Sequence, residues 1–174
     1  MNETESILVN RVAESDLQTI ALDELTGNKE IVDFDLKDYL FQGLILREKD
    51  FRQAVKEYSW PALEGKILAV HCSTEAIIPM WAYMLIAANA SAFTQKIYYG
   101  NKQEAMEAAL IGNINEKDWS YLQGKRVVVK GCSDMELPAA AYLIIAQKIQ
   151  PYVQSMMYGE PCSTVPIFKR PRQV

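Results

Sequence analysis

The sequence predicts an α/β fold with a mainly parallel sheet built from two repeated βαβ units, preceded by an N-terminal α+β extension. Three observations lead to this prediction. Residues 60–100 match residues 119–159 at a constant offset of 59 positions, with 13 identities in 41 positions. Each copy contains a short apolar run between turn residues, which is typical of a strand buried on both faces. Each copy then has a proline, Pro79 or Pro138, where a helix would begin.

The N-terminal extension, residues 1–59, carries weaker patterns. Residues 30–35 alternate between apolar and charged side chains, which predicts a half-buried strand. Residues 44–46 are a second candidate strand. Residues 49–58 place apolar side chains at helical spacing with charges between them, which predicts an amphipathic helix.

The two repeat units predict the same succession of elements. Their first strands should begin near Lys66 and Lys125, and their helices near the two prolines. Each unit should close with a second strand, over residues 96–99 or 155–158, that ends at a glycine. Strand, crossover helix and parallel strand form the βαβ unit, so two such units predict a mainly parallel sheet.

The remaining segments complete the predicted domain. A linking helix is expected over residues 103–111. Residues 160–174 are expected to form a tail, whose residues 169–172 are expected to be solvated. The helix over residues 79–90 is apolar nearly all round, so we expect both of its faces to be covered. We expect residues 1–174 to form a single domain, because a chain of this length can bury a full core.

Composition and charge limit the classes of function. The chain holds 22 acidic and 18 basic residues, and its net charge of −4 argues against nucleic acid as the main partner. The N-terminus lacks the pattern of a signal peptide. The longest uncharged run, residues 76–95, is too short and too mixed for a membrane span, so we expect no membrane association. An odd number of cysteines without a secretory signal predicts a reduced, cytoplasmic location.

The three cysteines are the candidate site. Cys72, Cys132 and Cys162 are each followed by serine, and each lies just past the end of a predicted strand. Because ligands bind at the carboxyl ends of parallel strands, we expect the three thiols at one edge of the sheet. Thiolates are ligands for zinc and for iron–sulfur clusters, which makes these the expected cofactors. A tetrahedral zinc needs a fourth ligand, and the candidates are His71, Glu75, Asp134, Glu160 and water.

Two other chemistries are compatible with the same residues. A cysteine before a helix N-terminus gains thiolate character, so one of the three could be the nucleophile of a thiol-dependent enzyme or a sulfur carrier. Free cysteine is also among the most buried residue types, and the three could be structural. The protein would then be a non-catalytic interaction protein, with a homodimer as the expected assembly. The residues leave open whether the protein is an enzyme.

Several long stretches resemble the bacterial domain of unknown function 2480 family. They are VNRVAESDL, VDFDLKDYLFQGLILREKDFR, WAYMLIA, VVVKGCSD and SMMYGEPCSTVPIFKR. The resemblance covers nearly the whole chain and implies no particular activity. It implies a link to iron–sulfur assembly proteins as partners and a role as an accessory in cluster handling. The family pattern does not regularly place histidine at position 71, so the resemblance leaves Cys72, Cys132 and Cys162 as the residues that would bind metal.

Overall fold

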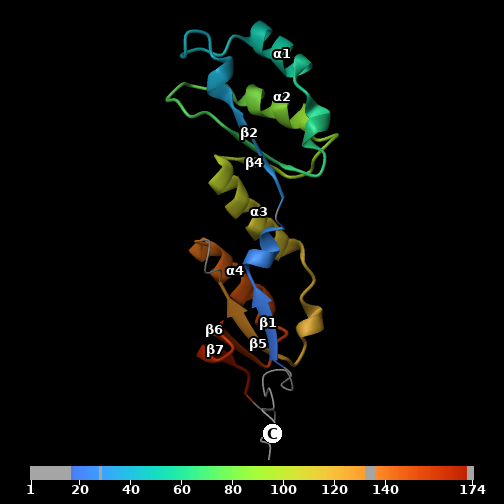
Figure 1. The fold of residues 1–174 in the computed structure, drawn as a ribbon, viewed down its shortest axis with the longest axis vertical. Helices are drawn as coiled ribbons and strands as arrows, with labels where there is room; N and C mark the ends of the chain where they lie inside the picture. The colour runs from blue at the N-terminus through green and yellow to red at the C-terminus, as the bar shows by residue number, and fades with distance from the viewer. Residues whose placement is uncertain (1–16, 28, 132–135, 172–174) are drawn as a thin grey trace, which may run out of the picture. The chain divides into compact units, whose positions relative to one another are not determined.

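The computed structural model describes residues 17–27, 29–131 and 136–171 and shows a mixed α/β fold with two sheets (Figure 1). The chain separates into two compact units. Unit 1 consists of Met1–Leu25 and Ile114–Val174, and unit 2 of Thr26–Asn113. Unit 2 is therefore inserted in the sequence between the first strand of unit 1 and the rest of that unit.

Unit 2 contains a three-stranded parallel sheet in the order β2-β3-β4. Its strands are β2 (Ile31–Asp35), β3 (Ile67–His71) and β4 (Ile97–Tyr99). Ile31 pairs with Ile67 in the first ladder, and Leu68 pairs with Ile97 in the second.

Helices cover both faces of the unit-2 sheet. The helices α1 (Glu48–Glu57) and α2 (Met80–Ala90) contribute to one core cluster, which also contains Leu68 and Val70 of β3. The helix α3 (Lys102–Glu116) contributes Ala105 and Ala109 to a second cluster with Ile67 and Ala69. The four residues Ile67–Val70 are all buried because β3 is covered on both sides.

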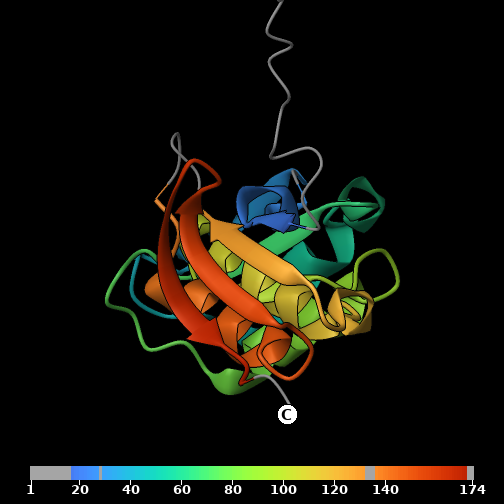
Figure 2. The same cartoon turned by 90° about the horizontal axis from the view of Figure 1, so that it is seen from below.

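Unit 1 contains a four-stranded sheet in the order β1-β5-β6-β7. Its strands are β1 (Leu17–Ala21), β5 (Arg126–Lys130), β6 (Ser155–Glu160) and β7 (Ser163–Lys169). The first three are parallel, and β7 returns antiparallel beside β6 (Figure 2). The helix α4 (Ala139–Ile149) connects β5 to β6.

Short 3-10 helices lead into several of these elements. They are η1 (Asp23–Thr26), η2 (Leu36–Tyr39), η3 (Trp60–Leu63) and η4 (Ser120–Leu122). The indole Nε1 of Trp60 donates to the carbonyl of Val55 at 2.8 Å, and that of Trp119 donates to the carbonyl of Ile114 at 2.9 Å. Each buried tryptophan thus ties the turn before a central strand to the preceding helix.

Several sequence predictions are confirmed by these elements. The strands expected near residues 30–35, 66 and 125 are present, and both helices begin one residue after Pro79 and Pro138. The structure has two mostly parallel sheets. The prediction of a single domain is not tested by the division into compact units and stays a prediction.

Two sequence predictions were wrong, and one strand was not predicted. Residues 44–46 form no strand, and Ile45 makes only an isolated bridge with Phe41. No strand was predicted within residues 160–174, yet β7 lies there, because its pairing with β6 outweighs the presence of Pro166 beside a register shift in the ladder. The helix over residues 79–90 is not covered on both faces, since Met80 and Met84 of α2 are 71% and 72% exposed. Apolar composition shows that a helix can be buried but not which elements cover it.

Candidate functional site

Cys72 follows directly after β3 in unit 2. Its thiol is free and half-buried, and it packs against the core cluster that α1 and α2 build. The Sγ atom lies 3.3 Å from Oγ1 of Thr74. Burial raises the pKa of the Tyr83 hydroxyl on α2, and the neighbouring Tyr99 and Cys72 raise it further. Cys72 and Tyr83 pack against the same core cluster.

Cys162 lies in unit 1, in the turn between β6 and β7, where it is a free and exposed cysteine. Cys132 lies outside the described residues. Within the described ranges, no group of three or more His, Cys, Asp or Glu side chains could hold a metal ion. Cys72 and Cys162 thus belong to different units, and the metal site of Cys72, Cys132 and Cys162 stays a prediction.

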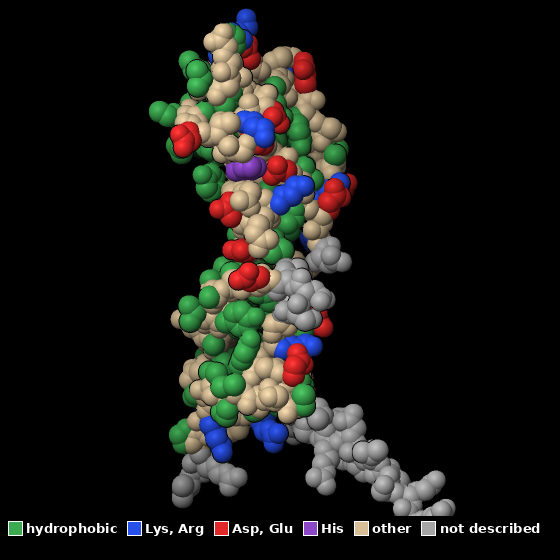
Figure 3. All heavy atoms as spheres, turned by 60° about the vertical axis from the view of Figure 1, so that its left-hand side comes forward, with side chains coloured by type: hydrophobic (Ala, Val, Ile, Leu, Met, Phe, Trp, Pro, Cys, Tyr) green, Lys and Arg blue, Asp and Glu red, His purple; other side chains and the backbone are tan. Residues whose placement is uncertain are grey.

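His71 is the last residue of β3 and lies on the other face of the sheet from Cys72. Residues 67 and 69, which share its strand parity, pack against α3, whereas Cys72 packs with the α2 cluster. The ring Nε2 lies 3.0 Å from Oδ1 of Asp33 on β2. Figure 3 shows this histidine in purple beside red acidic side chains. His71 is therefore paired with a carboxylate and does not share a site with Cys72.

Asp35, at the carboxyl end of β2, holds the loop that follows Cys72. Its Oδ1 accepts hydrogen bonds from the backbone N–H groups of Lys37 and Ser73, both at 3.0 Å, and its Oδ2 lies 3.1 Å from Nζ of Lys37. Burial by itself raises the pKa of the Asp35 carboxyl, but the hydrogen bonds from Ser73 and Lys37 outweigh it and hold the pKa well below its usual range. Both oxygens of the carboxylate are engaged, which fits a positioning role rather than a reactive one.

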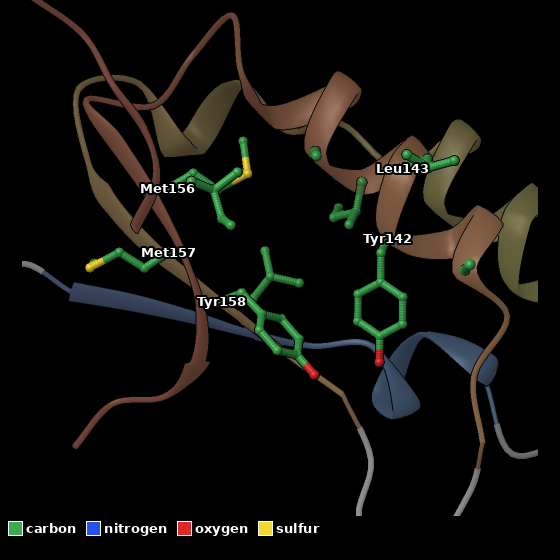
Figure 4. A pocket seen from close by; sticks show the side chains of 10 residues that line it. Tyr142, Leu143, Met156, Met157 and Tyr158 are labelled. Atoms are coloured by element: carbon green, nitrogen blue, oxygen red, sulfur yellow. The ribbon is translucent and has the colours of Figure 1, made fainter. Parts of the chain in front are cut away.

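Unit 1 has an apolar groove of about 570 Å³ between α4 and the strands β5, β6 and β7. Its lining residues are Val129, Ala139, Tyr142, Leu143, Ile145, Ala146, Met156, Met157, Tyr158 and Ile167. Figure 3 shows hydrophobic side chains gathered on the surface of this unit. In Figure 4 the rings of Tyr142 and Tyr158 lie side by side with their hydroxyls at one end of the groove, and the two methionines lie toward the other end.

Unit 2 has a groove of about 530 Å³ between α2 and β4. Its lining residues are Val70, Met80, Tyr83, Met84, Ala87, Ile97, Tyr98 and Tyr99. Each of these positions lies 59 residues before a residue that lines the unit-1 groove. The rings of Tyr83 and Tyr99 meet edge to face at 5.8 Å, as do those of Tyr142 and Tyr158. The two grooves are thus built from corresponding residues.

The comparison with protein families decides where the chain belongs. A family described as "Protein of unknown function (DUF2480)" matches residues 6–170, which is nearly the entire sequence. The chain belongs to the DUF2480 family. No curated protein and no solved structure matches it.

For this DUF2480 family protein, the grooves are the feature that the sequence analysis missed. Tyr83 and Tyr142 are among the repeated residues, but repetition alone does not distinguish a packing residue from one that lines an open groove. Met80 and Met84 lie one helical turn apart on α2, which places them on one face, but only the structure shows that this face is exposed. No helix in the described part of this family member is long and apolar enough to span a membrane.

Proposed function

We propose that this DUF2480 family protein is a non-catalytic binding protein, and that the unit-1 groove holds the apolar body of a small molecule. The observation that carries the proposal is the groove itself. Its volume of about 570 Å³ falls within the range of roughly 300–1,000 Å³ that is usual for ligand pockets. All ten lining residues are uncharged, so the ligand's buried part should be uncharged too.

The character of the lining supports a ligand with an aliphatic or aromatic body and one polar end. The hydroxyls of Tyr142 and Tyr158 are the polar groups at the end of the groove, where they can orient such a group. Met156 and Met157 supply flexible, polarisable side chains that adapt to the shape of an apolar guest. On the strand side, Ile167 of β7 adds to the wall of the groove.

Ala146→Phe should fill the unit-1 groove and weaken binding of the fluorescent probe anilinonaphthalene sulfonate by at least about tenfold, a loss of about 1.4 kcal/mol. The matched control is Ala87→Phe, because Ala87 occupies the corresponding position in the unit-2 groove. We expect one probe molecule per chain for the unmodified protein and for the Ala87→Phe variant, because the unit-2 groove lacks the wall that Ile167 of β7 adds in unit 1. Fluorescence titration measures the stoichiometry.

Two results would contradict this proposal. If binding of the probe does not saturate at one molecule per chain, the protein has no single discrete site for it. Equal weakening by Ala87→Phe and Ala146→Phe would place the probe outside the unit-1 groove. Thermal denaturation of each variant shows whether it remains folded at the titration temperature.

We also propose that the two units are copies of one duplicated βαβ unit. The ladders support this, because Leu68 pairs with Ile97 and Val127 with Met156, each pair shifted by 59 positions. The first ladders of the two sheets end at His71 and Lys130, which are also 59 positions apart. The matching grooves are a second argument for the duplication.

In a second candidate function, Cys72, Cys132 and Cys162 bind zinc or an iron–sulfur species. The protein would then be cytoplasmic and would work with iron–sulfur assembly proteins. This function is favoured by the free thiols of Cys72 and Cys162, one half-buried and one exposed. Elemental analysis of protein purified without oxygen tests it, with the triple Cys→Ser variant as control. Stoichiometric zinc or iron that the variant loses would support this function, and metal-free protein would rule it out. Rapid alkylation of one cysteine in metal-free protein would instead favour a thiol-dependent enzyme or sulfur carrier.

A further inference from the structure

The strand β4 ends the unit-2 sheet with an open edge. In the described part of the chain it pairs only with β3. Its three residues, Ile97–Tyr99, include no charge and no proline, which are two of the usual means of protecting a sheet edge from pairing. Tyr99 is 76% exposed, and the neighbouring groove adds the exposed Met80 and Met84 of α2. The edge and the groove together form one apolar surface.

The backbone of β4 is oriented for a further strand. The carbonyl of Lys96 accepts from the N–H of Leu68, and the N–H of Gly100 donates to the carbonyl of Val70. These bonds direct the even-numbered residues of β4 toward β3. Because backbone groups alternate along a strand, the N–H and C=O groups of Ile97 and Tyr99 point away from β3, toward the open edge.

Unit 1 shows what covers the corresponding edge. There β7 pairs antiparallel with β6, and it places Phe168 opposite Met156 and Val165 opposite Tyr158. Met156 and Tyr158 lie 59 positions after Ile97 and Tyr99. The same kind of edge, beside the same kind of groove, is thus completed by an antiparallel strand with apolar side chains.

We propose that β4 is a homodimer interface, in which it pairs antiparallel with β4 of a second copy about a two-fold axis at Tyr98. This register follows from the backbone, since it sets Ile97 opposite Tyr99 of the second copy, and both residues offer their N–H and C=O groups outward. Each groove residue of the strand then gains an apolar cross-strand partner, as Met156 and Tyr158 do in unit 1. A two-fold interface must be self-complementary, and this short uncharged strand meets that condition.

Charge complementarity supports the same register. Lys96 comes to lie opposite Gly100 of the second copy. The carboxylate of Glu104 lies against Gly100 within each chain and accepts a hydrogen bond from the N–H of Asn101. The ammonium of Lys96 donates to Oδ1 of Asn113 in its own chain. The two-fold axis therefore places this positive charge on the side of the interface where the other copy carries the Glu104 carboxylate.

This proposal uses unit 2 and does not rest on the ligand groove of unit 1. Tyr99→Lys should weaken the dimer by at least about tenfold, because it places a charge in the apolar pair with Ile97. Sedimentation velocity over a range of protein concentrations should give a species of twice the 19.7 kDa chain mass for the unmodified protein. Val165→Lys on β7 is the matched control and should leave the dimer intact, although Val165 is also exposed.

A disulfide between one introduced cysteine of each copy tests the strand register of the dimer without introducing a charge. In a background without the native cysteines, Tyr98→Cys places the two Cα atoms about 4.5 Å apart across the axis, within reach of a disulfide. Tyr99→Cys places them about 7–8 Å apart, beyond that reach. We expect a covalent dimer from the first variant only.

Other outcomes would overturn the proposal. Monomeric unmodified protein at every concentration would exclude the homodimer, as would a dimer that Tyr99→Lys leaves unchanged. A monomer that binds the synthetic peptide of residues 163–169, and loses that binding in Tyr99→Lys, would assign the β4 edge to a peptide partner instead. None of these results alters binding of the fluorescent probe in the unit-1 groove.

Discussion

Ile86→Ala and Ile145→Ala should each lower the free energy of unfolding by about 2–5 kcal/mol, the usual cost of truncating a large buried side chain. Ile86 lies on α2 and Ile145 on α4, at corresponding positions of the two units, and they are 0% and 1% exposed. Each helix is tied to its sheet by this inner face. Removal of three carbon atoms leaves a cavity that the neighbouring strand and helix cannot fill without moving.

Urea denaturation followed by circular dichroism measures the loss, and hydrogen exchange shows which unit it affects. We expect exchange protection to fall first in unit 2 for Ile86→Ala and first in unit 1 for Ile145→Ala. The matched controls are Met84→Ala and Leu143→Ala, whose side chains line the grooves of the two units but are exposed. These controls should change the free energy by no more than about 0.5 kcal/mol. A loss of that size for Ile86→Ala would place α2 outside the core.

The strands at the centre of each sheet could be predicted because their signal is local. The apolar runs of β3 and β5, bounded by turn residues, are typical of strands buried on both faces, and both are observed. The strands β1 and β7 were missed because their signal is not local. The short strand β1 lies near the start of the chain and pairs with β5, which comes much later in the sequence. The strand β7 contains Pro166. The segments of β1 and β7 form strands because they pair with β5 and β6.

The candidate site shows the same limit. The sequence predicts a helix over residues 79–90 correctly, yet the exposure of Met80 and Met84 depends on the absence of a covering element in the described structure. The Asp35 network joins residues 38 positions apart, and no spacing rule connects Asp35 with the amide of Ser73. The position of Cys72 at a strand end was predictable from the end of its apolar run. Whether it meets the other two cysteines is a question of long-range geometry that the pattern does not contain.

Asp35→Asn should lower the free energy of unfolding at pH 7 by about 1.5–3 kcal/mol, because the buried carboxylate accepts charge-assisted hydrogen bonds that an amide replaces poorly. The two amides of Lys37 and Ser73 on one oxygen, with the Lys37 ammonium on the other, favour the ionised form. Since the pKa of Asp35 is depressed in the folded state, its contribution to stability is fully present above the unfolded pKa of about 3.9. That contribution is lost as the pH falls through the depressed folded value.

The difference in stability between the unmodified protein and Asp35→Asn should therefore be constant from pH 7 to about pH 5 and shrink at lower pH. Urea denaturation at a series of pH values measures it. Asp38→Asn is the control, because Asp38 is an exposed carboxylate in η2, the 3-10 helix that Asp35 caps. Its substitution should change the free energy of unfolding by no more than about 0.5 kcal/mol. A difference for Asp35→Asn that does not change between pH 7 and pH 2 would show that the charge of Asp35 contributes nothing. The loop after Cys72 would then be held by packing alone.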